Sequence, residues 1–487
     1  MTVPTSNTMV SGNREGSSRP QRWGTSDDTH PSLRARQSNV SNPRTLRRNG
    51  PSTVPDLLTP AYRWFYYGIQ RIRGGVSPSQ VEHASQLLDA PQDVLQDHIE
   101  TRLQVTHGAG AAAREWLSRQ EAMEREHISA DPAYELPWIQ RFRRFERKKT
   151  SGSTGQPLRI CKDMRMAAQI DATMWALYRW HGIHPGVRHA RFWGLAPGGW
   201  QRCRTRILDR GLRRHRLSAF EFDGPAVRSA FHRLRSHQPR YIHAYPSLAD
   251  EFVRICGDEG LDGTDLGVQV LFLTGELLTD DVRSRIASYF QARVVNEYGC
   301  TESGLLAFEC EQGSMHLVPI ATLMEVARIS GDGPPTRALS GEVLITDLYG
   351  THRPFLRYRL GDRATIHADR SCNCGRHLPL VHIGDGRTDA FIVFPNGERL
   401  FCSILSRSMP PAVRRFQAVQ GDVGSLHIDI ELHPGERAEI TVAALQSALE
   451  SYIEGRIQVD ISVVPVIEPE PTGKLRYFVP LADKLSP

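Results

Sequence analysis

Six short motifs rich in glycine, hydroxyl and charged residues follow one another in a fixed order, and they constrain the fold more than any other feature of the chain. In order, they are Thr150–Pro157 (TSGSTGQP), Thr274–Glu276 (TGE), Asn296–Glu302 (NEYGCTE), Arg357–Asp362 (RYRLGD), Gly386–Asp389 (GRTD) and Pro471–Lys474 (PTGK). Each motif alone is a weak signal. The ordered set predicts one site that the fold assembles from segments far apart in the sequence.

The first motif predicts a loop that binds a polyphosphate. Its glycines let the backbone approach a ligand closely, and its amide N–H groups and hydroxyls donate hydrogen bonds to phosphate oxygens. The residues expected to contact phosphate are Thr150, Ser151, Gly152, Ser153, Thr154 and Gly155. The loop is not a Walker A motif, because no Gly-Lys-Ser/Thr ends it. A polar surface loop is the alternative for this segment taken alone.

Length, charge and cysteine content set the broad class. A chain of 487 residues is too long for one core and predicts two or more domains. The net charge of +6 is too small to indicate nucleic acid as a partner. No apolar run reaches the roughly 20 residues of a membrane helix, so we expect no membrane partner. Eight cysteines without an apolar signal segment favour a reducing, cytoplasmic location.

The composition divides the chain into three parts. Residues 1–54 have few large apolar side chains and are expected to form a disordered tail. Residues 55–385 are expected to form an α/β domain with a helical lead-in over 55–145. Residues 386–487 combine short alternating strands with one helix, Ala438–Gly455, and predict a small α+β domain.

Individual elements follow from hydrophobic spacing. Apolar residues at three- and four-residue intervals after Ser77 predict that helices begin there and continue to Arg119. The other predicted elements are strands at 189–194, 268–274 and 292–297, helices at 226–235 and 280–290, and antiparallel or barrel-like strands at 341–346 and 364–366.

Four motifs resemble the core motifs of the acyl-adenylate-forming (AMP-binding) superfamily: Thr150–Pro157, Tyr298–Glu302, Arg357–Asp362 and Pro471–Lys474. The nearest branch is that of the phenylacetate–coenzyme A ligase-like proteins, including relatives from capsule-biosynthesis clusters. The resemblance implies a large multi-layer N-terminal α/β domain with β-sheets and a barrel-like subdomain, followed by a small α+β lid. It also implies a ligase that adenylates a carboxylic acid with ATP, releases pyrophosphate and transfers the acyl group to a thiol such as coenzyme A.

The same resemblance implies a role for each matching residue. Gly275 and Glu276 would line the adenine slot. The other nucleotide contacts would come from Asn296 to adenine, Asp362 and Arg387 to the ribose, and Tyr298 in the same site. The catalytic group would comprise Thr301 at the α-phosphate, Glu302 holding Mg²⁺, and Lys474 bridging the substrate carboxylate and the α-phosphate. Mg²⁺ prefers oxygen ligands, so one carboxylate beside phosphate oxygens is a suitable site for this ion.

A Cys-x₅-His and a Cys-x-Cys pair predict a structural zinc site. Its ligands would be Cys310, His316, Cys372 and Cys374. Four thiolate or imidazole ligands are the number that a closed tetrahedral zinc site requires, so the ion would have no open position for catalysis. Unrelated buried thiols are the alternative, and Cys300, His377 and His382 are substitute ligands.

The sequence does not determine which group accepts the acyl group. Coenzyme A, a carrier protein and an amine are all candidates, with a thiol preferred. Arginines recur at helical spacing over 202–214 and suit either an anionic acceptor or a solvated helix face. A non-catalytic nucleotide- or acyl-binding protein on the same fold is the alternative of another class. The presence of Glu302, Asp362 and Lys474 argues against it.

Overall fold

The structure is a computed structural model of the chain. It describes residues 58–130, 145–149, 159–193, 199–218, 224–327, 338–367, 369–387, 391–397, 399–401, 403–468 and 476–481. All of these lie in one unit, Thr53–Pro487.

Helices form the start of the described chain, as the apolar spacing predicts. They are α1 (Thr59–Arg73), α2 (Pro78–Leu88), α3 (Gln92–His107), α4 (Ala113–Ser118) and α5 (Arg125–Ala130). Helix α2 begins at a capping box, in which the Gln80 amide N–H donates to Ser77 Oγ and the Ser77 N–H donates to Gln80 Oε1. These two bonds satisfy backbone donors that the first helical turn leaves free, which is why the helix starts there.

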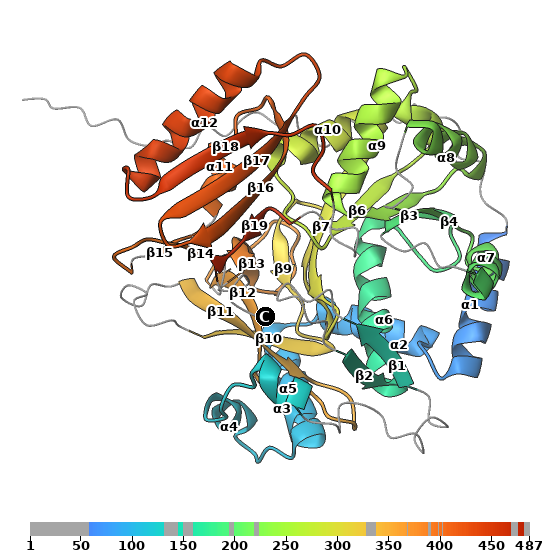
Figure 1. Cartoon of the computed structure of the whole chain (residues 1–487). Helices are drawn as coiled ribbons and strands as arrows, with labels where there is room; N and C mark the ends of the chain where they lie inside the picture. Colours follow the sequence, from blue (N-terminus) through green and yellow to red (C-terminus); the bar gives the residue numbers. More distant parts are fainter. Residues whose placement is uncertain are drawn as a thin grey trace, which may run out of the picture. The chain divides into compact units, whose positions relative to one another are not determined.

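One large mixed sheet organises most of the chain (Figure 1). Within the described residues it has eleven strands in the order β10-β11-β12-β13-β9-β8-β7-β6-β5-β3-β4. Its parallel half comprises β3 (His189–Trp193), β4 (Arg214–Ser218), β5 (Tyr241–Ala244), β6 (Val270–Thr274) and β7 (Arg293–Cys300). The mixed α/β architecture confirms the predicted fold class at this level.

Helices connect the parallel strands and cover both faces of this half. They are α6 (Met164–Tyr178), α7 (Gly199–Gly211), α8 (Gly224–His237), α9 (Pro246–Asp258) and α10 (Asp280–Phe290), with short 3₁₀ helices η4 (Arg179–His181) and η5 (Gly263–Leu266). One core packs α6 against Phe272 and Val295, and the second packs α8, α9 and α10 against Leu271 and Leu273. Neighbouring residues on β6 therefore enter different cores, as the alternation of side chains along a strand requires.

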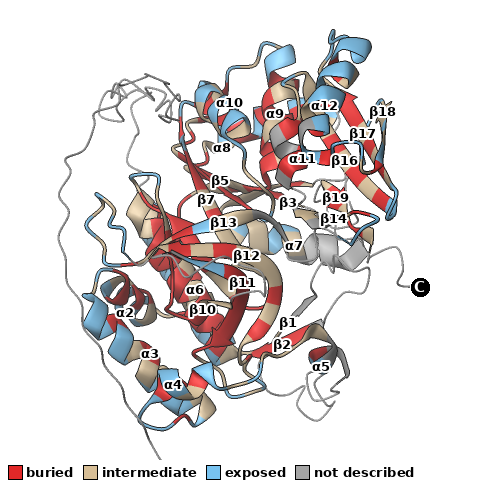
Figure 2. Cartoon of the chain, turned by 90° about the vertical axis from the view of Figure 1, so that its left-hand side faces the viewer, coloured by how far each residue is buried: buried red, intermediate tan, exposed pale blue. Residues whose placement is uncertain are grey.

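The other half of the large sheet is antiparallel. It contains β8 (Gly304–Glu309), β9 (Met315–Leu317), β10 (Thr322–Ala327), β11 (Ala338–Asp347), β12 (Tyr358–His367) and β13 (Leu380–Arg387). Its strands carry many of the buried residues in Figure 2. The strands predicted at 341–346 and 364–366 lie here as β11 and β12, whereas a barrel-like closure stays a prediction. A separate hairpin pairs β1 (Phe145–Lys149) with β2 (Arg159–Asp163).

A second, smaller sheet follows at the C-terminal end. Its order is β18-β17-β16-β19, and its elements are β16 (Val413–Asp422), β17 (Ser425–Leu432), α12 (Ala438–Ile453), β18 (Gln458–Val463) and β19 (Phe478–Val479). Before it come a two-stranded sheet, β14 (Phe391–Val393) with β15 (Arg399–Phe401), and α11 (Ser403–Ser408). Residues of α11, α12 and the strands share one apolar core. The division into domains at residue 386 stays a prediction.

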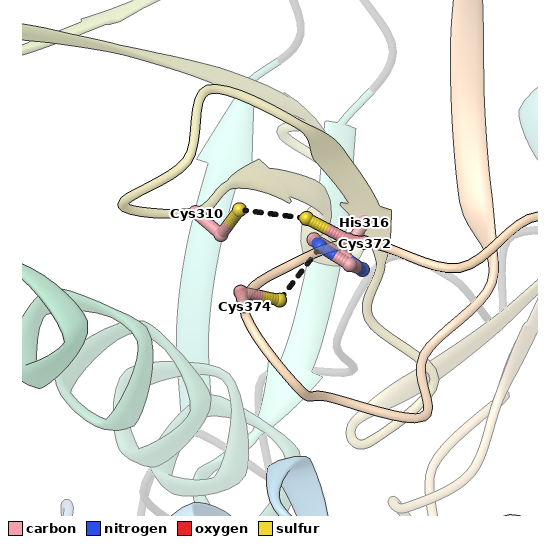
Figure 3. A group of neighbouring side chains, drawn as sticks. All are labelled: Cys310, His316, Cys372 and Cys374. Carbon is pink, nitrogen blue, oxygen red and sulfur yellow. Dashed lines mark hydrogen bonds between the residues drawn. The ribbon is translucent and has the colours of Figure 1, made fainter. Parts of the chain in front are cut away.

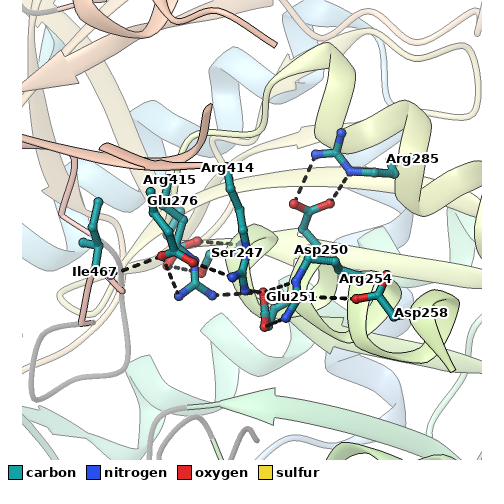
Figure 4. Close-up of polar contacts among 11 residues, drawn as sticks. Ser247, Asp250, Glu251, Arg254, Asp258, Glu276, Arg285, Arg414, Arg415 and Ile467 are labelled. Atoms are coloured by element: carbon teal, nitrogen blue, oxygen red, sulfur yellow. Dashed lines mark hydrogen bonds and ion pairs between the residues drawn. The ribbon is translucent and has the colours of Figure 1, made fainter. Parts of the chain in front are cut away.

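Ion pairs join this smaller sheet to helix α9 (Figure 4). Arg414 and Arg415 of β16 both contact the carboxylate of Glu251, which is 8% exposed. Arg414 also pairs with Glu431 of β17, and that carboxylate accepts a hydrogen bond from the Ile467 N–H at 3.1 Å. Two arginines and two buried carboxylates thus neutralise one another where β16 meets α9.

Among the described residues, no helix combines the length and the apolar character that crossing a membrane requires.

Candidate functional site

Three thiols and an imidazole converge between the ends of β8, β9 and β13 (Figure 3). The ligand atoms of Cys310, His316, Cys372 and Cys374 all lie within 4.8 Å of one another. Cys310 Sγ is 3.7 Å from Cys372 Sγ, and Cys374 Sγ is 3.3 Å from His316 Nε2. The fold therefore brings together the four residues that the sequence predicts as a metal site.

Two tight turns and one strand pairing place these ligands. Cys310 follows β8 in a turn that its N–H closes by donating to the Ser314 carbonyl at 2.9 Å. The second turn is closed by the Gly375 N–H, which donates to the Cys372 carbonyl at 3.3 Å. His316 pairs with Leu380 of β13, so β9 carries the first ligand pair to the second.

The cluster suits a tetrahedral zinc ion. Zinc–sulfur bonds of about 2.3 Å place two sulfurs roughly 3.8 Å apart, close to the observed 3.7 Å between Cys310 and Cys372. His316 Nδ1 lies 3.1 Å from the Leu378 carbonyl, and donation there leaves the Nε2 lone pair facing the thiols. Without an ion, burial raises the pKa of the Cys310 thiol to about 12. A bound cation would favour the thiolate form of these cysteines and so would stabilise the buried cluster.

A second group of predicted residues meets where β7 approaches β12 and β13. The Tyr298 hydroxyl donates a hydrogen bond of 2.7 Å to Asp362 Oδ2. Asp362 lies opposite Arg387 in the register of β12 and β13. Gly361 has φ 82°, a left-handed conformation that favours glycine, and it directs the chain into Asp362. Three residues predicted for the nucleotide site therefore lie in one place.

Thr301 and Glu302 lie in the turn between β7 and β8. Thr301 is exposed, whereas Glu302 is only 7% exposed. Burial raises the pKa of the Glu302 carboxyl, and the nearby Asp362 carboxylate raises it further, while Arg125 and Lys162 act in the opposite direction. Within the described residues, Glu302 forms no salt bridge. A buried carboxyl beside a half-buried carboxylate is a suitable place for a divalent cation.

Gly275 and Glu276 follow the end of β6, beside β7. Gly275 has φ 82°, which turns the chain directly after the strand. The Glu276 carboxylate accepts hydrogen bonds from the Ser247 N–H at 2.9 Å and the Ser247 hydroxyl at 3.0 Å (Figure 4). Asn296 pairs with Leu273 in the register of β6 and β7. The predicted adenine contacts thus share the carboxyl edge of two parallel strands, where α/β sheets bind ligands.

Some predicted residues lie outside the described part of the chain. They are the whole loop Thr150–Pro157, which holds Thr150, Ser151, Gly152, Ser153, Thr154 and Gly155, and the lysine Lys474. For Arg387 the structure describes only the backbone. Their roles stay predictions.

No family model matches the chain. Protein CapK of Staphylococcus aureus is 22% identical over 335 residues, which cover 68% of this chain and 73% of CapK. A phenylacetate–coenzyme A ligase of Thermus thermophilus is 24% identical over 290 residues, 57% of this chain and 62% of that ligase. The second match thus spans less than two thirds of the ligase.

A solved structure of 2-hydroxyisobutyryl-CoA ligase in the postadenylation state superposes with a TM-score of 0.62 at 17% identity, covering 81% of this chain and 91% of the ligase. These likenesses support the acyl-adenylate-forming superfamily, and within it the phenylacetate–coenzyme A ligase-like branch that the motifs predict.

Sequence reasoning missed a buried ion pair beneath the turn that carries Glu302. Lys162 Nζ lies 2.5 Å from Asp347 Oδ2, and Ser303 donates to the other oxygen of Asp347 at 2.8 Å. The Phe355 N–H also donates to this carboxylate, at 2.9 Å. No local sequence signal marks the pair, because its two charged residues lie on β2 and β11.

The arginines over 202–214 divide into two groups. Arg213 donates to the Gly186 carbonyl at 3.2 Å and stacks over the Tyr62 ring, and Arg214 pairs with Asp209 at 2.5 Å. These two side chains serve packing contacts within the chain. Arg206 and Arg210 of α7 are exposed to solvent.

A hollow of about 620 Å³ lies elsewhere, between α1, α2 and the start of α6. Trp64, Tyr67 and Arg165 are among its lining residues, and it shares no residue with the nucleotide or cysteine sites.

Proposed function

We propose that this protein is an ATP-dependent ligase that adenylates a carboxylic acid and then transfers the acyl group. The observation that carries the proposal is the meeting of Tyr298, Asp362 and the Arg387 position at the carboxyl edge of the large sheet, beside buried Glu302. The relatives support it, since one is named as a phenylacetate–coenzyme A ligase and a solved neighbour as a 2-hydroxyisobutyryl-CoA ligase.

In the proposed first step, a substrate carboxylate oxygen attacks the α-phosphorus of ATP. A bond forms between these atoms, and the bond to pyrophosphate breaks. Both reactants are anions, so positioning and charge stabilisation dominate catalysis. Asp362 offers two acceptor oxygens for vicinal ribose hydroxyls, with the Tyr298 hydrogen bond fixing its orientation. Lys474 would approach the α-phosphate as a mobile cation.

Mg²⁺, when bound, would neutralise phosphate charge, and Glu302 is the residue that would hold it. The fit rests on the raised pKa of this carboxyl, because a buried acid without a salt bridge among the described residues is stabilised as an anion by a cation. Thr301, exposed in the same turn, would orient the α-phosphate with its hydroxyl.

In the second step, a thiol would attack the acyl carbonyl carbon and AMP would leave. We propose coenzyme A as the acceptor, in agreement with the names of both ligases. An amine or a carrier protein remains the alternative acceptor. We further propose that residues 386–487 form the lid of the site, joined to helix α9 by the Glu251–Arg414 pair.

We also propose that Cys310, His316, Cys372 and Cys374 hold one structural zinc ion. The four protein ligands complete a tetrahedral set, so the ion would anchor the turn after β12 to the end of β8. It would leave the adenylation chemistry to the residues of the nucleotide site.

The test is carboxylate-dependent exchange of pyrophosphate into ATP by the purified full chain, with a panel of aryl, short acyl and hydroxy acids. We expect exchange with one class of acid. Asp362→Asn should lower kcat/KM for ATP about 10- to 100-fold, because it weakens hydrogen bonds to a charged acceptor. Lys474→Ala should still bind ATP but lose exchange by several orders of magnitude.

The matched control is Asp209→Asn, since Asp209 is a half-buried carboxylate that pairs with Arg214 and Arg216 away from the site. It should exchange like the wild type. Binding of ATP without exchange for any acid would instead favour the non-catalytic nucleotide-binding alternative, and normal turnover of Lys474→Ala would contradict the assigned lysine.

A further inference from the structure

A row of polar and aromatic side chains crosses four neighbouring parallel strands at their carboxyl ends. The row consists of Trp193 on β3, His243 on β5, Thr274 on β6 and Glu297 on β7. Arg191 pairs with His243, His243 with Phe272, and Thr274 with Glu297 in the strand registers. Because alternate residues of a strand share a face, all four members of the row point to the same side of the sheet.

The row holds a contact between a histidine and a buried carboxylate that is not used by the nucleotide site. His243 Nε2 lies 3.2 Å from Glu297 Oε2, and the Glu297 side chain is only 2% exposed. The contact lacks the alignment of a hydrogen bond, so His243 Nε2 has no hydrogen-bond partner among the described residues. Glu297 Oε1 likewise has no such partner within the described chain. Buried polar atoms in this state are costly, and each one requires an explanation.

The surroundings of the pair are aromatic and cationic. The Trp193 ring lies 5.2 Å from the His243 ring and 4.3 Å from the Tyr245 ring. The Arg191 guanidinium stacks over Trp193 at 4.2 Å, and its Nε is a further buried donor without a partner among the described residues. Burial raises the pKa of Tyr178, and the Glu297 carboxylate beside it raises it further, both through its charge and through a hydrogen bond with the Tyr178 side chain, so this hydroxyl stays neutral. The row thus combines flat apolar walls with a buried acceptor.

A carboxyl edge with these walls is where the acyl part of an acid would lie, beside the strand that carries Asn296 and Tyr298 on its other face. A hydrocarbon acid would leave Glu297 Oε1 unpaired in a dry site. An acid with a hydroxyl or amino group would donate a hydrogen bond to it, and the free energy of that bond would enter binding.

We propose that Glu297 and His243 select an acid substrate that carries a hydrogen-bond donor, a hydroxyl or an amine, on its acyl or aryl part. This inference rests on the proposed adenylation function and adds the substrate class to it. Glu297 accepts the donor hydrogen, and His243 holds the carboxylate in place. Trp193 and Tyr245 supply the apolar faces against which the rest of the acyl group packs.

The test uses pyrophosphate exchange with acids in matched pairs that differ by one group. Suitable pairs are isobutyrate with 2-hydroxyisobutyrate, phenylacetate with 4-hydroxyphenylacetate, and benzoate with 2-aminobenzoate. In at least one pair, we expect the acid with the donor to have a kcat/KM about 100-fold higher or more, because a site built to pair with a hydroxyl rejects the analogue that lacks it.

Variants separate recognition from folding. Glu297→Met should reduce this preference to below about tenfold, whereas Glu297→Gln, which keeps an acceptor oxygen, should retain part of it. Glu342→Gln is the matched control, because Glu342 is a buried carboxylate that pairs with Arg359 on β12. It should keep the full preference. Should Glu297→Met fail to fold, calorimetric binding of each acid pair to the wild-type protein without ATP gives the same comparison.

Two outcomes would contradict the inference, and they have different consequences for the proposed function. Exchange that is equal or faster with the plain acid of every active pair overturns the inference and leaves the adenylation function standing. Absence of exchange with every acid, although the protein binds ATP, overturns the proposed function and the inference with it.

Discussion

Two regions of the large sheet bury a carboxylate in opposite ways. Asp347 on β11 is fully buried and receives Lys162 at 2.5 Å, the Ser303 hydroxyl at 2.8 Å and the Phe355 N–H at 2.9 Å. Glu297 on β7 is also buried, at 4% exposed. Its Oε1 has no hydrogen-bond partner among the described residues, and His243 Nε2 lies 3.2 Å from its Oε2.

The difference distinguishes a buried charge that the chain itself neutralises from a buried charge whose partner is a ligand. A buried ion costs several kcal/mol unless partners replace the lost water, so a region that only has to fold acquires those partners from the chain itself. A region that binds a ligand leaves some of them to the ligand. By this criterion the Asp347 region stabilises the fold, whereas the edge that carries Glu297 and Glu302 fits the proposed site.

The Cys/His cluster allows the strongest test of the comparison, because we expect an ion to complete it. Purified protein should contain about one zinc per chain by elemental analysis. Removing the zinc with a chelator should destabilise the fold by about 4 kcal/mol, the value for a ligand at a thousand times its Kd. Metal removal should therefore lower the melting temperature about as much as the most destabilising substitution described below.

Cysteine variants provide the control for that measurement. Cys374→Ala should lose the zinc, whereas Cys256→Ala, a change at a fully buried cysteine of α9 outside the cluster, should keep it. If the zinc-free wild-type protein were as stable as the zinc-containing protein, the proposed structural role of zinc would be wrong.

Asp347→Asn should produce an effect of similar size. It would leave the Lys162 ammonium in a buried position without its counter-ion, which costs about 3–5 kcal/mol. Urea unfolding followed by tryptophan fluorescence would measure the loss. Glu259→Gln is the comparison variant, since its pair with Arg228 is exposed to solvent and should give no measurable change. A small effect of Asp347→Asn would show that the network is not structural.

Glu302→Gln should have the smallest effect on stability, and one of opposite sign. Burial raises the folded pKa of Glu302 above its unfolded value, so the folded state binds the proton more tightly. The wild type therefore loses stability as pH rises from the unfolded pKa of about 4.3 through the raised value. Glutamine does not titrate, so the ligand-free variant should be more stable than the wild type at pH 7 and lose this advantage near pH 4.

Thermal unfolding from pH 4 to pH 8 would measure that difference. The same variant should lose pyrophosphate exchange, which separates the role of Glu302 in the site from its cost to the fold. A variant less stable than the wild type at pH 7 would place Glu302 with Asp347, among carboxylates that the chain itself neutralises.

Much of the fold follows from local patterns in the sequence. The helix predicted at 280–290 is α10, with the bounds Asp280–Phe290, because Thr279 caps it and its apolar residues have helical spacing. The ligand pattern of Cys310, His316 and the Cys-x-Cys pair predicts a cluster, and the structure brings the four residues within 4.8 Å. The motif order also predicts that residues of β7 and β12 meet, as Tyr298 and Asp362 do.

Contacts set by strand register could not be predicted in this way. Glu297 stands inside the motif NEYGCTE, but its neighbour His243 lies on β5, and only the order β5-β6-β7 places them on one face. The basic stretch likewise suggests a surface for anions, whereas Arg213 and Arg214 are held by contacts within the fold. Partners of this kind depend on packing between distant segments, which has no local signature.

By itself, the sequence determined the α/β class, the superfamily and the residue types of the two sites, because helix caps, apolar spacing and ligand spacing act over a few residues. Only the tertiary structure decided which buried charges are neutralised by the chain and which are left for a ligand. The physical reason is that the cost of a buried charge depends on every group around it, and those groups come together only when the sheet forms.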